Sequence, residues 1–73
     1  MTLEEAIERA REEALRRGFP WLEPARASHE RTLGLVGKRQ IHVRSNAESL
    51  GTNVHALFDE STGTLEHIAL LPR

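Results

Sequence analysis

Three of the four histidines are the residues best placed to do chemistry together. His42, His55 and His67 each fall in a segment with strand-like composition. Imidazoles on one face of neighbouring strands can approach closely enough for two of them to bind one metal ion. The chain has no cysteine and no spacing motif of a metal site, so histidines on a solvated strand face explain the same pattern. We expect no metal and no cofactor.

A carboxylate beside one of these imidazoles would make an acid–base pair, and Asp59 is the candidate. Asp59 also opens a segment that ends in Gly63, and an aspartate in that position normally accepts hydrogen bonds from the backbone of its own turn. A chain of 73 residues rarely encloses the roughly 300 to 1,000 Å³ of a substrate pocket. We therefore expect a protein that is not an enzyme.

A short basic strip accompanies the histidines, because Lys38, Arg39 and Arg44 lie close to His42 in the sequence. Such a strip can bind an acidic partner, although a charged, solvated strand face explains it as well. On the first interpretation, the partner-binding residues are Arg39, His42, Arg44 and His55.

The most regular element that must support these residues is a helix over residues 3–17. Its apolar stripe has helical spacing and consists of Leu3, Ile7, Ala10 and Ala14. Thr2 and Glu5 have the spacing of a capping box, in which each side chain accepts from the other's backbone amide. Gly18 can adopt the left-handed conformation that ends a helix.

The segment after the helix carries Phe19, Trp21 and Leu22 between two prolines. Tryptophan often anchors interfaces, but in so small a protein we expect these three residues to cover the core as a lid. Residues 25–31 have no clear period, and their start stays unassigned, with a strand beginning near Glu30.

The remainder of the chain predicts antiparallel strands. Residues 32–36 and 39–45 form the arms of a hairpin around a two-residue turn, Gly37–Lys38. A second hairpin joins 53–59 to 65–71 through residues 60–63. Gln40, His42 and Arg44 alternate with apolar residues, which indicates a sheet with one wet face. The sequence predicts one α+β domain over residues 1–73, an N-terminal amphipathic helix packed on about four antiparallel strands.

The helix opening Thr-Leu-Glu-Glu-Ala-Ile, the strand Ile41-His42-Val43 and the closing Asp59-x-x-Thr62-Gly63-x-Leu65 resemble the PepSY domain. The resemblance implies a small inhibitory or regulatory module, often outside the cytoplasm and attached to peptidases. Residues 19–38 have no counterpart in it. The outline is also similar to cystatin-like and nuclear-transport-factor-like folds, some of which are immunity proteins against bacterial toxins.

The charge and hydropathy of the chain limit the classes of partner that we expect. Ten basic and eleven acidic residues give a formal charge of -1, without the positive field that nucleic acid requires. The acidic start lacks the character of a signal peptide, and no apolar stretch reaches the length of a membrane span. We expect a cytoplasmic protein that binds neither nucleic acid nor membrane.

The last strand suggests self-association, because Ile68 and Leu70 alternate with Leu65, Ala69 and Leu71. A strand that is apolar on both faces is usually covered on both, so we expect a homodimer formed through the sheet. The leading hypothesis is a non-enzymatic protein-binding module, inhibitor-like or immunity-like, that binds a larger protein through its sheet face. The alternatives are a small enzyme or ligand-binding protein with a pocket at a homodimer interface, and a pure dimerisation domain.

Overall fold

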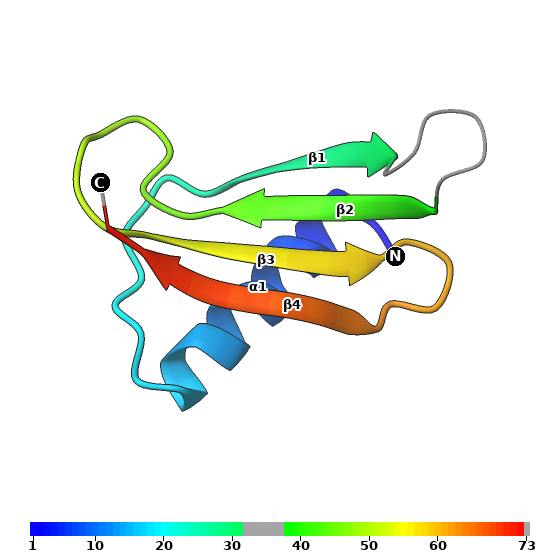
Figure 1. The fold of residues 1–73 in the computed structure, drawn as a ribbon, viewed down its shortest axis with the longest axis horizontal. Helices are drawn as coiled ribbons and strands as arrows, with labels where there is room; N and C mark the ends of the chain where they lie inside the picture. Colours follow the sequence, from blue (N-terminus) through cyan, green and yellow to red (C-terminus); the bar gives the residue numbers. More distant parts are fainter. Residues whose placement is uncertain (32–37, 73) are drawn as a thin grey trace.

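The computed structural model describes residues 1–31 and 38–72. One helix, α1 (Leu3–Arg16), precedes four strands, β1 (Arg26–Arg31), β2 (Arg39–Arg44), β3 (Asn53–Asp59) and β4 (Leu65–Leu71) (Figure 1). The strands form one antiparallel sheet in the order β1-β2-β3-β4, so that each strand pairs with its neighbour in sequence. The predicted α+β arrangement is confirmed.

Both ends of α1 follow from local chemistry. Thr2 Oγ1 accepts from the Glu5 amide at 3.1 Å, and the Glu5 carboxylate accepts from the Thr2 amide at 2.9 Å, which is the predicted capping box. The helix ends at Arg16, one residue earlier than predicted. Gly18 then adopts φ 76°, which lets the Phe19 amide donate to the Ala14 carbonyl at 2.8 Å.

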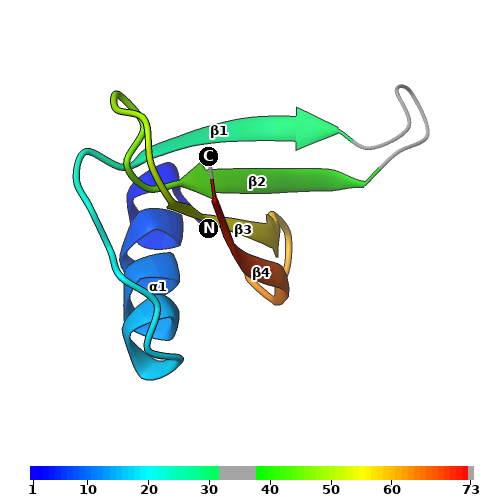
Figure 2. The same cartoon turned by 60° about the vertical axis from the view of Figure 1, so that its left-hand side comes forward.

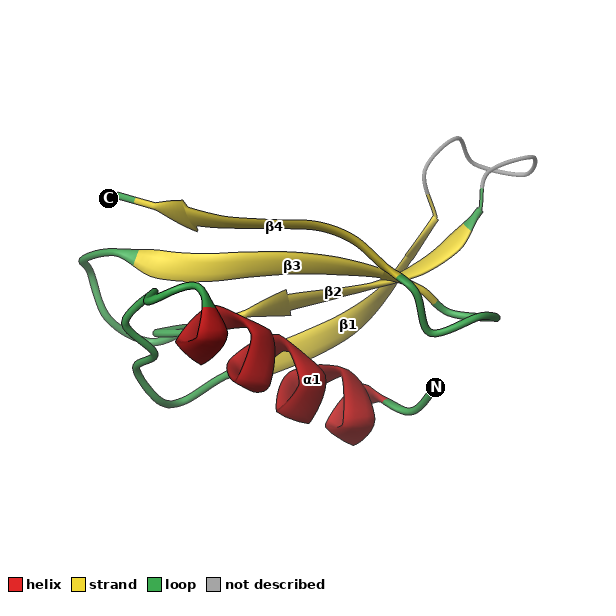
Figure 3. Cartoon of the chain, turned by 90° about the horizontal axis from the view of Figure 1, so that it is seen from below, coloured by secondary structure: helices red, strands yellow, loops and turns green. Residues whose placement is uncertain are grey.

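The core lies between α1 and one face of the sheet. Figures 2 and 3 show α1 along that face, where it contacts β1, β2 and β3. Ala6, Ala10 and Ala14 are fully buried, and their small side chains let the helix backbone approach the sheet. The sheet contributes the buried apolar residues Ile41, Val43, Val54, Ala56 and Phe58. Across the described residues, no helix has the length and apolar character that crossing a membrane requires.

The predicted lid is confirmed only in part. Trp21 packs against the core cluster, as expected, whereas Leu22 is half exposed. The backbone carbonyl of Leu22 instead accepts a hydrogen bond from the backbone amide of Asn46 at 2.7 Å. This hydrogen bond ties the helix–sheet connection to the loop between β2 and β3.

The first hairpin differs from the prediction. β1 occupies Arg26–Arg31, of which the sequence predicted only a strand beginning near Glu30, and the predicted strand 32–36 and Gly37 of the predicted turn lie outside the described residues. Arg39 pairs with Arg31, whereas a two-residue turn at 37–38 would have paired it with residue 36. The physical reason is that β1 is an exposed edge strand, in which Ala27 is the only residue that packs against the core.

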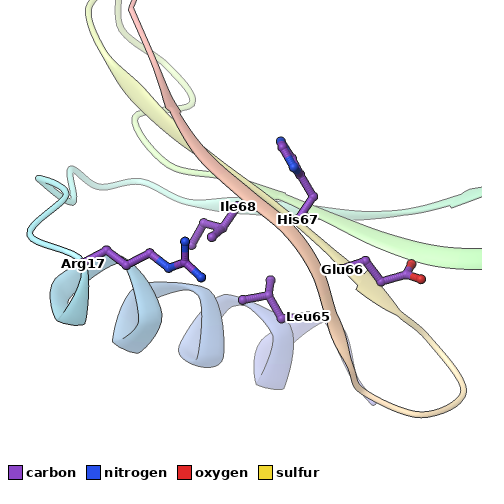
Figure 4. A pocket seen from close by; sticks show the side chains of 5 residues that line it. All are labelled: Arg17, Leu65, Glu66, His67 and Ile68. Atoms are coloured by element: carbon purple, nitrogen blue, oxygen red, sulfur yellow. The ribbon is translucent and has the colours of Figure 1, made fainter.

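A β-bulge interrupts the ladder between β3 and β4 at Leu57 and Phe58. It places one extra residue on β4, so that Leu65 and Ile68 both pack against the core. Figure 4 shows their side chains towards α1, with His67 pointing away from it. The strict alternation predicted for this strand is therefore wrong at Leu65, which shares the helix side with Ile68.

Candidate functional site

The sheet face opposite α1, which we call the open face, carries most of the candidate residues. On β1 and β2 this face carries the even-numbered residues, and the register aligns them with odd-numbered residues of β3 and β4. The open face therefore includes Ser28, Glu30, Gln40, His42, Arg44, His55, Leu57, Asp59, His67 and Ala69. Most of them are polar, and the predicted wet face is confirmed. Three of the four predicted site residues, His42, Arg44 and His55, lie together on it.

The two central histidines are in direct contact. His42 Nε2 lies 2.9 Å from His55 Nδ1, and the ring centroids are 5.0 Å apart with an interplanar angle of 31°. The register pairs His55 with Arg44 and His42 with Leu57, so the imidazoles meet along a diagonal of the ladder. One proton between the two nitrogens makes this contact a hydrogen bond.

Each imidazole also has an oxygen near its other nitrogen. His55 Nε2 lies 3.1 Å from Asn53 Oδ1, and His42 Nδ1 lies 3.7 Å from a Glu30 carboxylate oxygen. When His55 donates to the Asn53 oxygen, its Nδ1 accepts the proton of His42 Nε2. The four side chains thus form a line across β1, β2 and β3 that runs from a carboxylate through two imidazoles to an amide. Asn53 is buried, which fixes the far end of that line.

His67 does not join the pair. It lies opposite Leu57, which stands between it and His42 in the same row of the sheet. Only two of the three histidines that the sequence singled out are therefore brought together. Across residues 1–31 and 38–72, no three His, Asp or Glu side chains converge in a way that would ligate a metal ion.

Two arginines face each other beside the histidine pair. Arg26 of β1 lies directly opposite Arg44 of β2, and with Ser28 and His42 they line a depression of about 300 Å³. Arg26 Nη2 lies 3.1 Å from a carboxylate oxygen of Glu48. Like charges directly opposite in a ladder are destabilising, and the Glu48 carboxylate offsets part of this repulsion.

The loop that follows β2 places Glu48 beside Arg26. Asn46 adopts φ 49°, and its side-chain amide donates to the carbonyls of Leu50 and Thr52, which closes the loop on itself. The Arg44 guanidinium donates to the Ala47 carbonyl at 3.1 Å. The loop backbone thereby holds Arg44 in position, while Glu48 covers Arg26 from the exposed end.

The sequence missed Arg26, Ser28 and Glu30 as site residues, because a strand was predicted only from near Glu30. No clear signal could have found them, because Ala27 is the one apolar residue in Arg26–Arg31. Asn53 was missed as well, because a buried asparagine cannot be distinguished by sequence from one that opens a loop.

Arg39 is the predicted site residue that the structure places elsewhere. It is in phase with Ile41 and therefore lies on the helix side of the sheet, whereas Arg44 lies on the open face. Its Nε is 3.5 Å from a Glu60 carboxylate oxygen, whose partner oxygen lies 2.6 Å from His29 Nδ1. These residues line a separate depression of about 180 Å³ with Arg31. The predicted grouping of Arg39 with the three open-face residues is wrong.

Lys38 does not extend the basic strip either. Its ammonium contacts the Glu66 carboxylate and lies 3.4 Å from Asp59, while Gln40 donates to Glu66 at 2.8 Å. The hydrogen bond from Lys38 lowers the pKa of Glu66, and the same contact raises the pKa of Lys38. Two carboxylates therefore balance the positive charge at this end of the open face.

Asp59 has the structural role that its sequence position predicted. Its Oδ1 accepts from the Ser61 hydroxyl at 2.7 Å, the Ser61 amide at 2.9 Å and the Thr62 amide at 3.1 Å. The Ser61 hydroxyl contributes most to lowering the pKa of Asp59, followed by the Thr62 amide. Gly63, with φ 73°, completes the turn. These bonds hold the carboxylate in the turn between β3 and β4.

A further depression, of about 260 Å³, lies along β4 and is lined by Arg17, Leu65, Glu66, His67 and Ile68 (Figure 4). Its side chains project to different sides of the strand. His67 points away from Leu65 and Ile68, so the polar and apolar groups do not converge on one ligand. The open face near Arg26 and Arg44 is the better candidate site.

Comparisons with protein-family models, with curated proteins and with solved structures gave no match. The resemblance to PepSY, cystatin-like and nuclear-transport-factor-like proteins therefore stays a prediction. The open face, with its charged and imidazole side chains, is the basis of the function proposed below.

Proposed function

We propose that the chain is a non-enzymatic protein-binding module that holds an acidic segment of a larger protein on its open face, between Arg26 and Arg44. The observation that carries the proposal is the register of β1 and β2, which places Arg26 directly opposite Arg44 beside one depression. Two like charges in this position are destabilising. A carboxylate placed between them turns that repulsion into two charge-assisted hydrogen bonds.

The groups around the depression suit such an acceptor. Each guanidinium presents a planar fork of N–H donors that matches a carboxylate, and the Ser28 hydroxyl lines the same wall. The depression lies on the exposed strand β1 and is not roofed by α1, which covers the other face (Figure 3). A shallow, charged surface of this kind fits a segment of protein better than a small substrate that must be enclosed.

A second pair of arginines lies opposite each other in the ladder, and one of its members already has a carboxylate partner within the chain. Arg31 lies opposite Arg39, but the Glu60 side chain, 21% exposed, contacts Arg39 and His29. Glu48 differs from Glu60 because its side chain is 58% exposed and contacts Arg26 from a loop. An exposed ion pair contributes little to stability, so a partner's carboxylate can replace Glu48 at small cost.

Charge reversal tests the proposal. Arg44→Glu is expected to abolish a complex with the larger protein, because it places a carboxylate where the partner's carboxylate binds. Arg39→Glu reverses a charge five residues away on the same strand but on the other face, and is expected to leave the complex intact. Equal binding by both variants would overturn the proposal.

A further inference from the structure

The His42–His55 pair has the arrangement of groups that protein metal sites use. The facing nitrogens, His42 Nε2 and His55 Nδ1, are 2.9 Å apart, and each remote nitrogen is near an oxygen of Glu30 or Asn53. Histidines that ligate metal ions almost always donate their remote N–H to such an oxygen, which sets the ring orientation and raises the basicity of the ligating nitrogen. Asn53 is thus within hydrogen-bond distance of the remote nitrogen of His55, and the Glu30 carboxylate lies 3.7 Å from that of His42.

The separation of the two nitrogens favours a particular coordination geometry. With metal–nitrogen bonds of about 2.0 to 2.1 Å, a separation of 2.9 Å corresponds to an angle of about 90° at the ion. That angle is the one between adjacent positions of an octahedral or square-planar ion, whereas tetrahedral coordination needs the nitrogens to be about 3.4 Å apart. Ni²⁺ and Cu²⁺ adopt the former geometries and bind imidazole well.

We propose that His42 and His55 bind one divalent transition-metal ion of this class, Ni²⁺ or Cu²⁺, as a pair of adjacent ligands on the open face. In the bound state His42 carries its proton on Nδ1, beside Glu30, so that His42 Nε2 and His55 Nδ1 both present a lone pair to the ion. The rings turn about their side-chain bonds so that both lone pairs are directed at the ion. Because the His42 side chain is 28% exposed, water can reach the remaining coordination positions.

Side chains of both charges surround the two histidines, and their balance determines the expected affinity for the metal ion. Arg44 lies opposite His55 and opposes the binding of a cation, whereas the carboxylate of Glu30 beside His42 favours it. With two protein ligands and partly balanced charges, the site exchanges its ion with solvent and does not hold it as a buried structural centre.

The test uses the full chain without an affinity tag, titrated with NiCl₂ by calorimetry in a non-coordinating buffer. We expect one Ni²⁺ per chain, and a loss of affinity of more than about tenfold in both His42→Ala and His55→Ala. The two other histidines supply matched controls, and His29→Ala and His67→Ala are expected to bind Ni²⁺ as the wild-type chain does. Absence of Ni²⁺ binding to the wild-type chain, or equal losses in all four variants, would overturn the proposal.

A second measurement, a titration with Cu²⁺, locates the ion without relying on variants. Cu²⁺ is paramagnetic in every coordination geometry and broadens the NMR signals of nuclei close to it, so the signals of residues 42 and 55 are expected to disappear first on titration. Broadening centred on His67, His29 or the N-terminal amine would place the ion elsewhere and contradict the proposal.

Discussion

His42 Nε2 and His55 Nδ1 lie 2.9 Å apart, although the β2–β3 register places Leu57 directly opposite His42. The contact therefore depends on two long side chains that reach along the diagonal of the ladder on the open face. Three further side chains surround the two imidazoles. Glu30 and Asn53 lie beside the remote nitrogens, and Arg44 stands next to His55 as part of the proposed binding surface.

The histidine contact is expected to stabilise the fold measurably. A double-mutant cycle of His42→Ala and His55→Ala, measured by urea unfolding at pH 8, should give a coupling free energy of about 0.5 to 1.5 kcal/mol, the value of an ordinary hydrogen bond. The same cycle with His42→Ala and His67→Ala should give a value near zero, because Leu57 separates those side chains. Equal coupling in the two cycles would show that the contact contributes nothing.

Asp59→Asn is expected to lower the melting temperature at neutral pH, because three donors in the turn prefer the ionised carboxylate. The folded-state pKa of Asp59 lies below its ordinary value of 3.8. The stabilisation is therefore fully present above that value and is lost as the pH falls through the folded-state pKa. The difference in melting temperature between wild type and variant should be constant above about pH 5 and shrink below about pH 4.

Glu12→Gln, on the exposed side of α1, is the control for this pH series. Thermal unfolding followed by circular dichroism from pH 7 to about pH 2 supplies the measurement for both variants. A gap between Asp59→Asn and wild type that persists unchanged to the lowest pH would contradict the assigned role of the carboxylate.

The contact between α1 and the sheet depends on alanine. Ala10 is fully buried, and Ala10→Leu is expected to destabilise the fold by about 1 to 3 kcal/mol, because the larger side chain forces the helix away from the sheet. Glu12→Leu, two residues away and exposed, should change the free energy of unfolding by less than about 0.5 kcal/mol. Denaturant unfolding of the two variants compares them directly, and similar losses would contradict the described packing.

The homodimer expected from the apolar last strand stays a prediction. Leu71, 43% exposed, is opposite Asn53, and a dimer through the sheet would bury it. Sedimentation velocity is expected to show a dimer for the wild-type chain and a monomer for Leu71→Asp. A wild-type monomer at concentrations of about 100 μM would refute self-association of this kind, because a stable dimer dissociates at far lower concentration.

Elements with a strong local signal could be predicted from the sequence. The capping box of Thr2 and Glu5 and the alanine stripe determined α1, and the alternation around Ile41 determined the wet face. The alternation also places Arg39 on the side of Ile41, so its grouping with Arg44 reflected closeness in the chain and neglected the strand period.

Other features depend on tertiary structure. β1 carries a single core residue, Ala27, and such an edge strand has almost no hydrophobic pattern. The bulge that brings Leu65 and Ile68 to one side inserts an extra residue without a distinctive sequence. The sequence placed His42 and His55 on neighbouring strands, but their contact requires the register, which only the folded sheet defines.

The open-face proposal also predicts an unusual effect on stability. Arg44→Glu replaces a like-charge pair with an ion pair to Arg26, so the free energy of unfolding should stay the same or rise by roughly 0.2 to 1 kcal/mol. Urea unfolding measures the change. A clear loss of stability would show that Arg44 is retained for folding, through its bond to the Ala47 carbonyl.

The most direct test of the central claim is native mass spectrometry of the chain captured with its partners from lysate of its source organism, in three forms: wild type, Arg44→Glu and Arg39→Glu. We expect a stoichiometric complex with one larger protein for wild type and Arg39→Glu, and loss of that complex in Arg44→Glu. A complex that survives Arg44→Glu, or that Arg39→Glu abolishes instead, would contradict binding through the open face.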